Sequence, residues 1–182
     1  MSRFRTYRSS QAVRDQHAEV HVGPEHLIVP YFVVEGQNRR EAIASLHGVD
    51  RFSIDQLLID LDDTVALGLS KIILFGVISE DQKDELATQA YASNNLIERA
   101  VAAVKQAFPQ LTVFTDVCLC GYASHGHCGL VKGTEIDNDS TLPLLGAMAV
   151  SHARGGADFV APSAMMDFQV AAIRQALDEA GF

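Results

Sequence analysis

All three cysteines of this 182-residue chain lie in one short stretch, DVCLCGYASHGHCG, at residues 116–129. Cys118 and Cys120 are two residues apart, so their side chains share one face wherever the backbone is extended. Cys128 follows after a loop whose glycines can bend the backbone back on itself. Three thiolates that converge on one point make a soft site suited to zinc, so this spacing predicts a metal site.

The number of protein ligands would decide what such a metal does. Three thiolates leave one coordination position open, as in catalytic zinc sites, whereas a fourth ligand from His125 or His127 would make the site structural. Free cysteines are also often small buried hydrophobic residues, and a catalytic cysteine–histidine pair is a further interpretation. Metal binding is the interpretation that accounts for all three thiols together.

The composition is that of an ordinary globular domain, with 48% hydrophobic and 20% charged residues. The formal net charge of −9 argues against a nucleic-acid partner and against binding to an anionic membrane surface. No apolar run approaches the roughly 20 residues that span a bilayer, and the basic N-terminus lacks the apolar region of a secretory signal. The odd number of cysteines does not suit a disulfide framework. We therefore expect a cytoplasmic protein.

Apolar, β-branched runs alternate along the chain with longer segments of helical period, which is typical of βαβ units and a parallel sheet. The expected strands are residues 27–34, 71–77, 111–117 and 157–161, and the expected helices are residues 53–67, 95–107, 141–154 and 166–180. The fold class is therefore α/β with four βα units. The cysteine loop follows the third strand and the PSAMMD turn follows the fourth, at the end of the sheet where such folds build their sites.

A closed eight-stranded βα barrel usually needs about 250 residues, so four βα units could form only half of such a barrel. The sheet of such a half-barrel has two open edges, which are a liability unless they are covered or paired. We therefore expect a homodimer or a larger homo-oligomer. Residues 27–182 are interpreted as the half-barrel domain. Residues 1–26 are interpreted either as an N-terminal arm that crosses to a neighbouring subunit or as a mobile terminus.

Long motifs in the chain resemble the porphobilinogen synthase family, also called the 5-aminolevulinate dehydratase family. They are DVCLCGYASHGHCGL, DNDSTL at 137–142 and GADFVAPSAMMDFQVAAIRQALDEAGF at 156–182, with weaker similarity in LIVPYFVVEG and KIILFGVIS. The resemblance implies a TIM barrel with an N-terminal arm that embraces a neighbour, usually in an octamer. It also implies an enzyme of tetrapyrrole and heme biosynthesis that condenses two molecules of 5-aminolevulinate into porphobilinogen.

The resemblance assigns roles to individual residues. Cys118, Cys120 and Cys128 match the cysteines that hold a catalytic zinc in many members of the family. Asp116 and Ser163 match an aspartate and a serine of the substrate pocket and are the candidate catalytic residues. His127 matches a histidine that joins a second zinc site in some members, whose own cysteine partner lies further along those members' chains.

The chain departs from the family pattern in its lysines. In the family, two lysines on later strands form Schiff bases with the substrates, and none of the four lysines here matches them: Lys71, Lys83, Lys105 and Lys132. A Schiff-base lysine converts a ketone into an electrophilic iminium, and zinc cannot substitute for that step. Gly121 and Phe168 also stand where family members often have other residues.

These observations leave three hypotheses about function. The first is a zinc-binding half-barrel that lacks both Schiff-base lysines and does not complete porphobilinogen synthesis alone, such as a sensor, a metal carrier or a regulatory subunit. The second is a fragment or split subunit of an active synthase, completed by a lysine-bearing chain. The third is a lysine-independent lyase or hydrolase that uses zinc and Asp116. The resemblance also implies a small molecule like 5-aminolevulinate as a partner.

Overall fold

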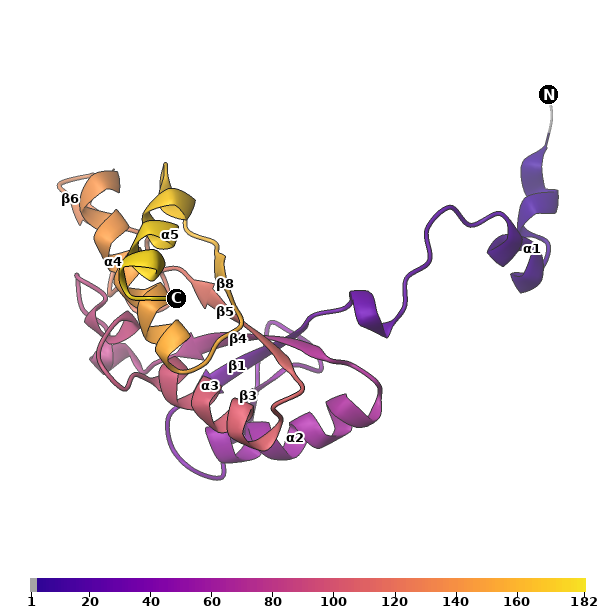
Figure 1. The fold of residues 1–182 in the computed structure, drawn as a ribbon, viewed down its shortest axis with the longest axis horizontal. Helices are drawn as coiled ribbons and strands as arrows, with labels where there is room; N and C mark the ends of the chain where they lie inside the picture. The colour runs from indigo at the N-terminus through magenta and orange to yellow at the C-terminus, as the bar shows by residue number, and fades with distance from the viewer. Residues whose placement is uncertain (1–2) are drawn as a thin grey trace.

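The computed structural model describes residues 3–182, which form a six-stranded sheet with helices packed along one face (Figure 1). The strands lie side by side in the order β2-β3-β1-β4-β5-β8. Four of them pair in parallel and in chain order: β1 (Val29–Val34), β4 (Lys71–Val77), β5 (Thr112–Val117) and β8 (Phe159–Pro162). The predicted α/β half-barrel is therefore confirmed, as an open sheet that does not close into a barrel.

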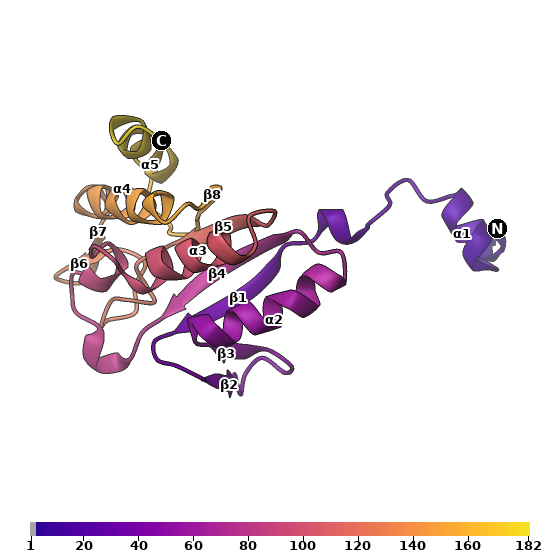
Figure 2. The same cartoon turned by 60° about the horizontal axis from the view of Figure 1, so that its bottom comes forward.

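Each of these parallel strands is followed in the sequence by one helix, which begins after an intervening loop, turn or hairpin. The bounds are α2 (Ile54–Ala66), α3 (Leu96–Ala107), α4 (Asn138–Arg154) and α5 (Gln169–Glu179). The two helices expected at 53–67 and 95–107 are confirmed to within one residue at each end, with Ser53 and Asn95 at their N-caps. Helices α2 and α3 lie along the sheet, while α5 packs on the outer side of α4 (Figure 2).

The starts of the last two helices differ from the prediction. Helix α4 begins at Asn138 rather than at 141, because the Asp137 carboxylate accepts the backbone N–H of Ser140 at 3.1 Å and caps the helix there. Helix α5 begins at Gln169 rather than at 166. Phe168 has a φ of 64°, in the left-handed region, and a residue in that conformation cannot lie within a right-handed helix.

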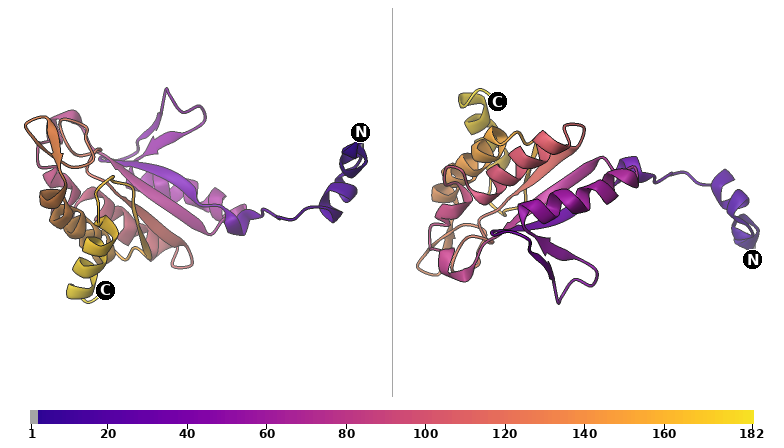
Figure 3. Two further views of the ribbon diagram at one scale, coloured as in Figure 1. Left: turned by 90° about the horizontal axis from the view of Figure 1, so that it is seen from above. Right: turned by 90° about the horizontal axis from the view of Figure 1, so that it is seen from below.

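Two short hairpins were not predicted. The hairpin of β2 (Arg40–Ala42) and β3 (Asp50–Phe52) extends the sheet beyond β1, so this edge is not open there as the sequence suggested (Figure 3). Strands β6 (Leu130–Lys132) and β7 (Glu135–Asp137) form a separate hairpin after the cysteine loop. Strands of three residues are too short to show a hydrophobic period, so the sequence pattern could not reveal them.

The N-terminal segment extends away from the sheet (Figure 1). It contains two 3-10 turns, Phe4–Arg8 and Pro24–His26, and the short helix α1 (Gln11–Gln16), and none of these elements has a buried residue. The division into an arm at 1–26 and a half-barrel domain at 27–182 stays a prediction. Within residues 3–182, no helix is both long enough and apolar enough to cross a membrane.

The two faces of the sheet differ in what covers them. Ile72 and Leu74 of β4 are fully buried under the helices. The opposite face, which we call the open face, carries aromatic rings from adjacent strands in register. Phe32 stacks on Phe75 with ring centroids 5.3 Å apart, and Phe114 stacks on Phe159 at 4.7 Å. Phe159 is 54% exposed. An apolar face of this kind is typical of a surface that further structure covers.

His152 of α4 is a fully buried titratable group. Neither of its ring nitrogens has a hydrogen-bond partner among residues 3–182. Burial lowers its pKa from 6.5 to about 3, because the charged imidazolium is not solvated there. Below about pH 6.5 the unfolded chain therefore binds a proton that the folded chain does not bind until about pH 3. The corresponding stability is present above pH 6.5 and is lost as the pH falls toward 3.

Replacement of this group should flatten the pH dependence of stability. In His152→Leu, we expect the slope of the unfolding free energy between pH 3 and pH 6.5 to fall by up to about 1.4 kcal/mol per pH unit. Urea unfolding at a series of pH values measures this slope. His47 is exposed, so His47→Leu is the matched control and should keep the native slope. An unchanged slope in His152→Leu would contradict the assignment.

Candidate metal centre

The three cysteines meet at the carboxyl end of β5, in the loop that follows Val117. Their Sγ atoms all lie within 4.8 Å of one another, and all three thiols are free. Cys118 is buried, Cys128 is half-buried and Cys120 is exposed, so one side of the cluster opens to solvent. No histidine or carboxylate among residues 3–182 joins this group at that distance. The structure therefore brings together the three cysteines that the sequence singled out.

The outgoing side of the loop is shaped by a tight turn and a close approach to β4. The carbonyl of Leu119 accepts the N–H groups of Tyr122 and Ala123, each at 2.9 Å, so the chain turns directly after the first cysteine. The buried ring of Tyr122 then packs against Gly76 of β4. A Cβ at Gly76 would lie only 2.2 Å from the Tyr122 hydroxyl oxygen, so a residue without a side chain is required there.

The returning side of the loop is held by α4. Gly129 is buried, and a Cβ at this position would lie 2.8 Å from Oγ1 of Thr141. The same Oγ1 accepts the N–H of Leu130 at 2.9 Å and donates to the carbonyl of Asp137 at 2.6 Å. Both sides of the cysteine loop are thus held in place by contacts with neighbouring elements.

A shared proton sets the charge of the thiol cluster. The thiol of Cys118 donates to Sγ of Cys120 over 3.3 Å. This hydrogen bond, together with burial, raises the pKa of Cys118, because its proton is held between the two sulfurs. The same bond lowers the pKa of Cys120 to about 6, with a smaller contribution from Cys128. One thiolate is therefore present near neutral pH, and the thiolate is the form that binds metals.

The two histidines of the loop contact the backbone. Nε2 of His125 donates to the carbonyl of Glu85 at 3.3 Å, and Nδ1 of His125 accepts the N–H of His127 at 3.1 Å. Both ring nitrogens of His125 are thus occupied within the protein. The ring of His127 lies 5.5 Å from that of His125, centroid to centroid, and His127 is exposed. The assignment of His127 as a metal ligand stays a prediction.

The two candidate catalytic residues face each other across adjacent strand ends. Asp116 is at the end of β5 and Ser163 follows β8, and the Ser163 hydroxyl donates to Oδ1 of Asp116 at 2.5 Å. Burial raises the pKa of the Asp116 carboxyl, and the hydrogen bond from Ser163 partly opposes this effect. Asp116 is half-buried and is two residues from Cys118, so a carboxyl with a raised pKa lies close in sequence to the thiol cluster.

Asn138 positions the turn that carries Ser163. The side-chain oxygen of Asn138 accepts the N–H of Asp167 at 2.7 Å, and its amide donates to the Asp167 carbonyl at 3.3 Å. The sequence indicated only local capping in this DNDS stretch. A partner 29 residues away leaves no periodic signal, so the sequence could not reveal this connection.

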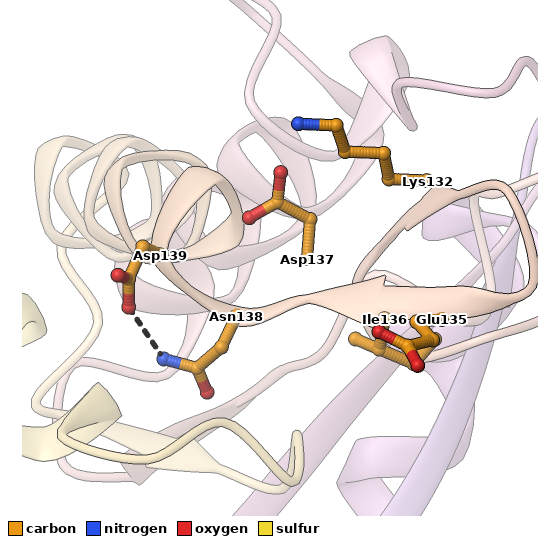
Figure 4. Close-up of a pocket in the computed structure, with 6 residues that line it drawn as sticks. All are labelled: Lys132, Glu135, Ile136, Asp137, Asn138 and Asp139. Atoms are coloured by element: carbon orange, nitrogen blue, oxygen red, sulfur yellow. Dashed lines mark hydrogen bonds between the residues drawn. The ribbon is translucent and has the colours of Figure 1, made fainter.

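A surface pocket of about 310 Å³ lies beside the β6–β7 hairpin and the start of α4 (Figure 4). Its lining consists of Lys132, Glu135, Ile136, Asp137, Asn138 and Asp139. Several of these polar groups are used locally: Asp137 caps α4, and the amide of Asn138 donates to Asp139 at 3.1 Å. None of the three cysteines contributes to the lining, so this pocket is separate from the thiol cluster.

Comparison with known proteins gives one consistent result. The family model described as "Delta-aminolevulinic acid dehydratase" matches residues 1–182. The chain is 43% identical to the delta-aminolevulinic acid dehydratase of Bacillus subtilis (strain 168), over 100% of this chain and 55% of that protein. It is 39% identical to the delta-aminolevulinic acid dehydratase of Ruminiclostridium josui, over 100% of this chain and 88% of that sequence.

The fold has a close counterpart among solved structures. It superposes with a TM-score of 0.92 and 37% identity on a crystal structure of delta-aminolevulinic acid dehydratase (porphobilinogen synthase) from Toxoplasma gondii ME49 in complex with the reaction product porphobilinogen. The match covers 100% of this chain and 52% of that one. The chain thus spans about half the length of the Bacillus and Toxoplasma proteins.

The shared proton predicts unequal reactivity of the thiols in the metal-free protein. We expect iodoacetamide to alkylate Cys120 first, with a rate that titrates near pH 6. Cys118→Ala removes the main donor and should move this midpoint up toward about 8.5, the value of an ordinary thiol. Cys128→Ala, which removes the weaker donor, should move it less. Mass spectrometry of modified peptides against pH measures each midpoint, and equal midpoints in all three proteins would contradict the arrangement.

Proposed function

Since this chain belongs to the delta-aminolevulinic acid dehydratase family, we propose that residues 1–182 form the zinc-binding half of a porphobilinogen synthase active site. The observation that carries the proposal is the convergence of three free Sγ atoms within 4.8 Å at the end of β5. Thiolate sulfur suits zinc, and three protein ligands leave a position for water or substrate. The reaction would be the condensation of two 5-aminolevulinate molecules to porphobilinogen in heme biosynthesis.

Different residues of this chain would bind the metal, transfer a proton and bind the substrate. Cys118, Cys120 and Cys128 would hold the zinc, which when bound supplies a Lewis acid that polarises a carbonyl or activates a water. Asp116 would hold or accept a proton from the substrate, because its carboxyl lies half-buried at the strand end beside the thiols. Ser163 is exposed, and its hydroxyl donates a hydrogen bond to Asp116. The Ser163 oxygen would therefore be available to accept a hydrogen bond from the substrate.

The open face of the sheet supports a second half. The aromatic rings on this face are partly exposed, and relatives such as the Bacillus protein extend well beyond the region matched here. We propose that four further βα units cover this face and bring the Schiff-base lysines to the carboxyl ends of the strands. The extra units would come from more of the same polypeptide or from a separate chain. The extended N-terminal segment would contact a neighbouring subunit in a homo-oligomer.

Zinc binding is tested directly on the purified protein. We expect one zinc per chain, and X-ray absorption should find three sulfur ligands and one light-atom ligand. Cys118→Ala, Cys120→Ala and Cys128→Ala should each abolish stoichiometric binding. The variant His127→Ala tests the fourth ligand. If the light-atom ligand of zinc changes in this variant, His127 is that fourth ligand. A protein with no metal and three free thiols would remove the proposal.

Activity measurements separate the first two hypotheses about the half-barrel. Residues 1–182 with zinc and 5-aminolevulinate should form no porphobilinogen above background, because no lysine here is matched to the Schiff-base positions. Addition of a lysine-bearing second half should give activity, and Asp116→Asn should then lower kcat by about 10²–10⁴-fold. If the second half restores nothing although it associates, the half-barrel is a metal-binding protein without synthase activity. Porphobilinogen from residues 1–182 alone would contradict both hypotheses.

A further inference from the structure

The cysteine loop is held from outside by the segment that follows β4. Asp84 and Ala123 form a parallel β-bridge, and the N–H of Ser124 donates to the Asp84 carbonyl at 3.0 Å. The next carbonyl along, that of Glu85, accepts Nε2 of His125 at 3.3 Å. Three consecutive residues of the cysteine loop therefore bind two consecutive residues of the segment after β4. We call this set of contacts, between residues 84–85 and 123–125, the clasp.

The side chain of Asp84 fixes its own segment of the clasp. Its carboxylate accepts the N–H of Leu86 at 2.8 Å, the N–H of Thr88 at 3.2 Å and the Thr88 hydroxyl. These donors lower the pKa of Asp84, with the Thr88 hydroxyl as the largest cause, so the carboxylate stays ionised and bound. The turn they enclose contains Ala87, which is buried with a left-handed φ of 54°. Such a conformation persists only where its surroundings hold it, as the carboxylate does here.

His125 carries the constraint from the clasp toward the third cysteine. Its Nε2 is held by Glu85, and its Nδ1 accepts the N–H of His127, the residue directly before Cys128. Cys118 is held separately, because it directly follows β5 in the sheet. The distance between the first and the third thiol therefore depends on the clasp as well as on the loop itself.

We propose that Asp84 and His125 are positioning residues for the metal centre, which hold residues 118–128 in the shape that brings the three thiols together before metal binds. This inference rests on the proposed binding of zinc by these thiols. A preformed loop loses less conformational freedom when it binds metal than a mobile loop does. Groups that orient metal ligands in this way typically change metal affinity by about 10–100-fold when they are removed.

The test compares metal affinity in matched aspartate variants of the purified protein. In Asp84→Ala, we expect the dissociation constant for zinc to rise by about 10–100-fold in competition with a chromophoric chelator. Cobalt at saturation should still give the thiolate charge-transfer band of the native protein, because the three ligands remain. Asp81→Ala is the control, since the side chain of Asp81 is exposed and makes no hydrogen bond or ion pair within residues 3–182.

Further variants test which contacts of the clasp affect the zinc affinity. Asp84→Asn keeps one acceptor and Thr88→Val removes one donor, so both should weaken zinc binding less than Asp84→Ala does. His125→Ala should weaken binding to a similar extent as Asp84→Ala. The combined variant should lose less than the product of the two single effects, because both residues act in one chain of contacts.

Hydrogen exchange separates this inference from the proposed function. In the metal-free protein, amides of residues 118–128 should exchange faster in Asp84→Ala than in Asp81→Ala or the native protein. If the native protein binds no metal, the proposed function fails, and faster exchange still supports the clasp as the device that shapes the loop. Native zinc affinity in Asp84→Ala would overturn the positioning role, whether or not its melting temperature falls.

Discussion

The pairing of β5 with β8 is the constraint on which the rest of the site depends. Because the two strands are parallel and in register, Asp116 lies opposite Ala161 and both strands end at the same edge of the sheet. The segments that follow β5 and β8 must then begin at that edge. The cysteine loop and the turn with Ser163 are neighbours for this reason, although the whole of α4 lies between them in the sequence.

The thiol cluster places three ionisable sulfurs close together in a partly buried site. Three thiolates close together would repel one another, and the hydrogen bond from Cys118 to Cys120 reduces this repulsion because it raises the pKa of the buried thiol and lowers the pKa of the exposed one. A divalent cation would replace that proton and neutralise the ligands, because thiols must lose their protons to bind metal. The three Sγ atoms, all within 4.8 Å of one another, are close enough to bind one such ion together.

The open face of the sheet connects the fold to the proposed second half. Aromatic rings such as those of Phe114 and Phe159 stack in pairs across the strands, yet Phe159 remains half exposed. The side chains at the carboxyl end of β5, that of Asp116 among them, lie at the edge of this face. Whatever covers the rings would also enclose the thiols and the carboxyl from the other side, which would exclude water from the proposed site.

The sequence by itself determined the α/β class, the parallel strands, the bounds of β4 and α3, and the three thiols as one group. These depend on local period, on caps such as Asn95 and on spacing within a single loop, all of which are properties of neighbouring residues. Only the tertiary structure decided the edge hairpin of β2 and β3, the contact of Asn138 with Asp167, and the contact of Asp84 with the cysteine loop. Each of these joins backbone or side-chain groups across strand ends or turns, and partners chosen by packing leave no periodic trace in the sequence.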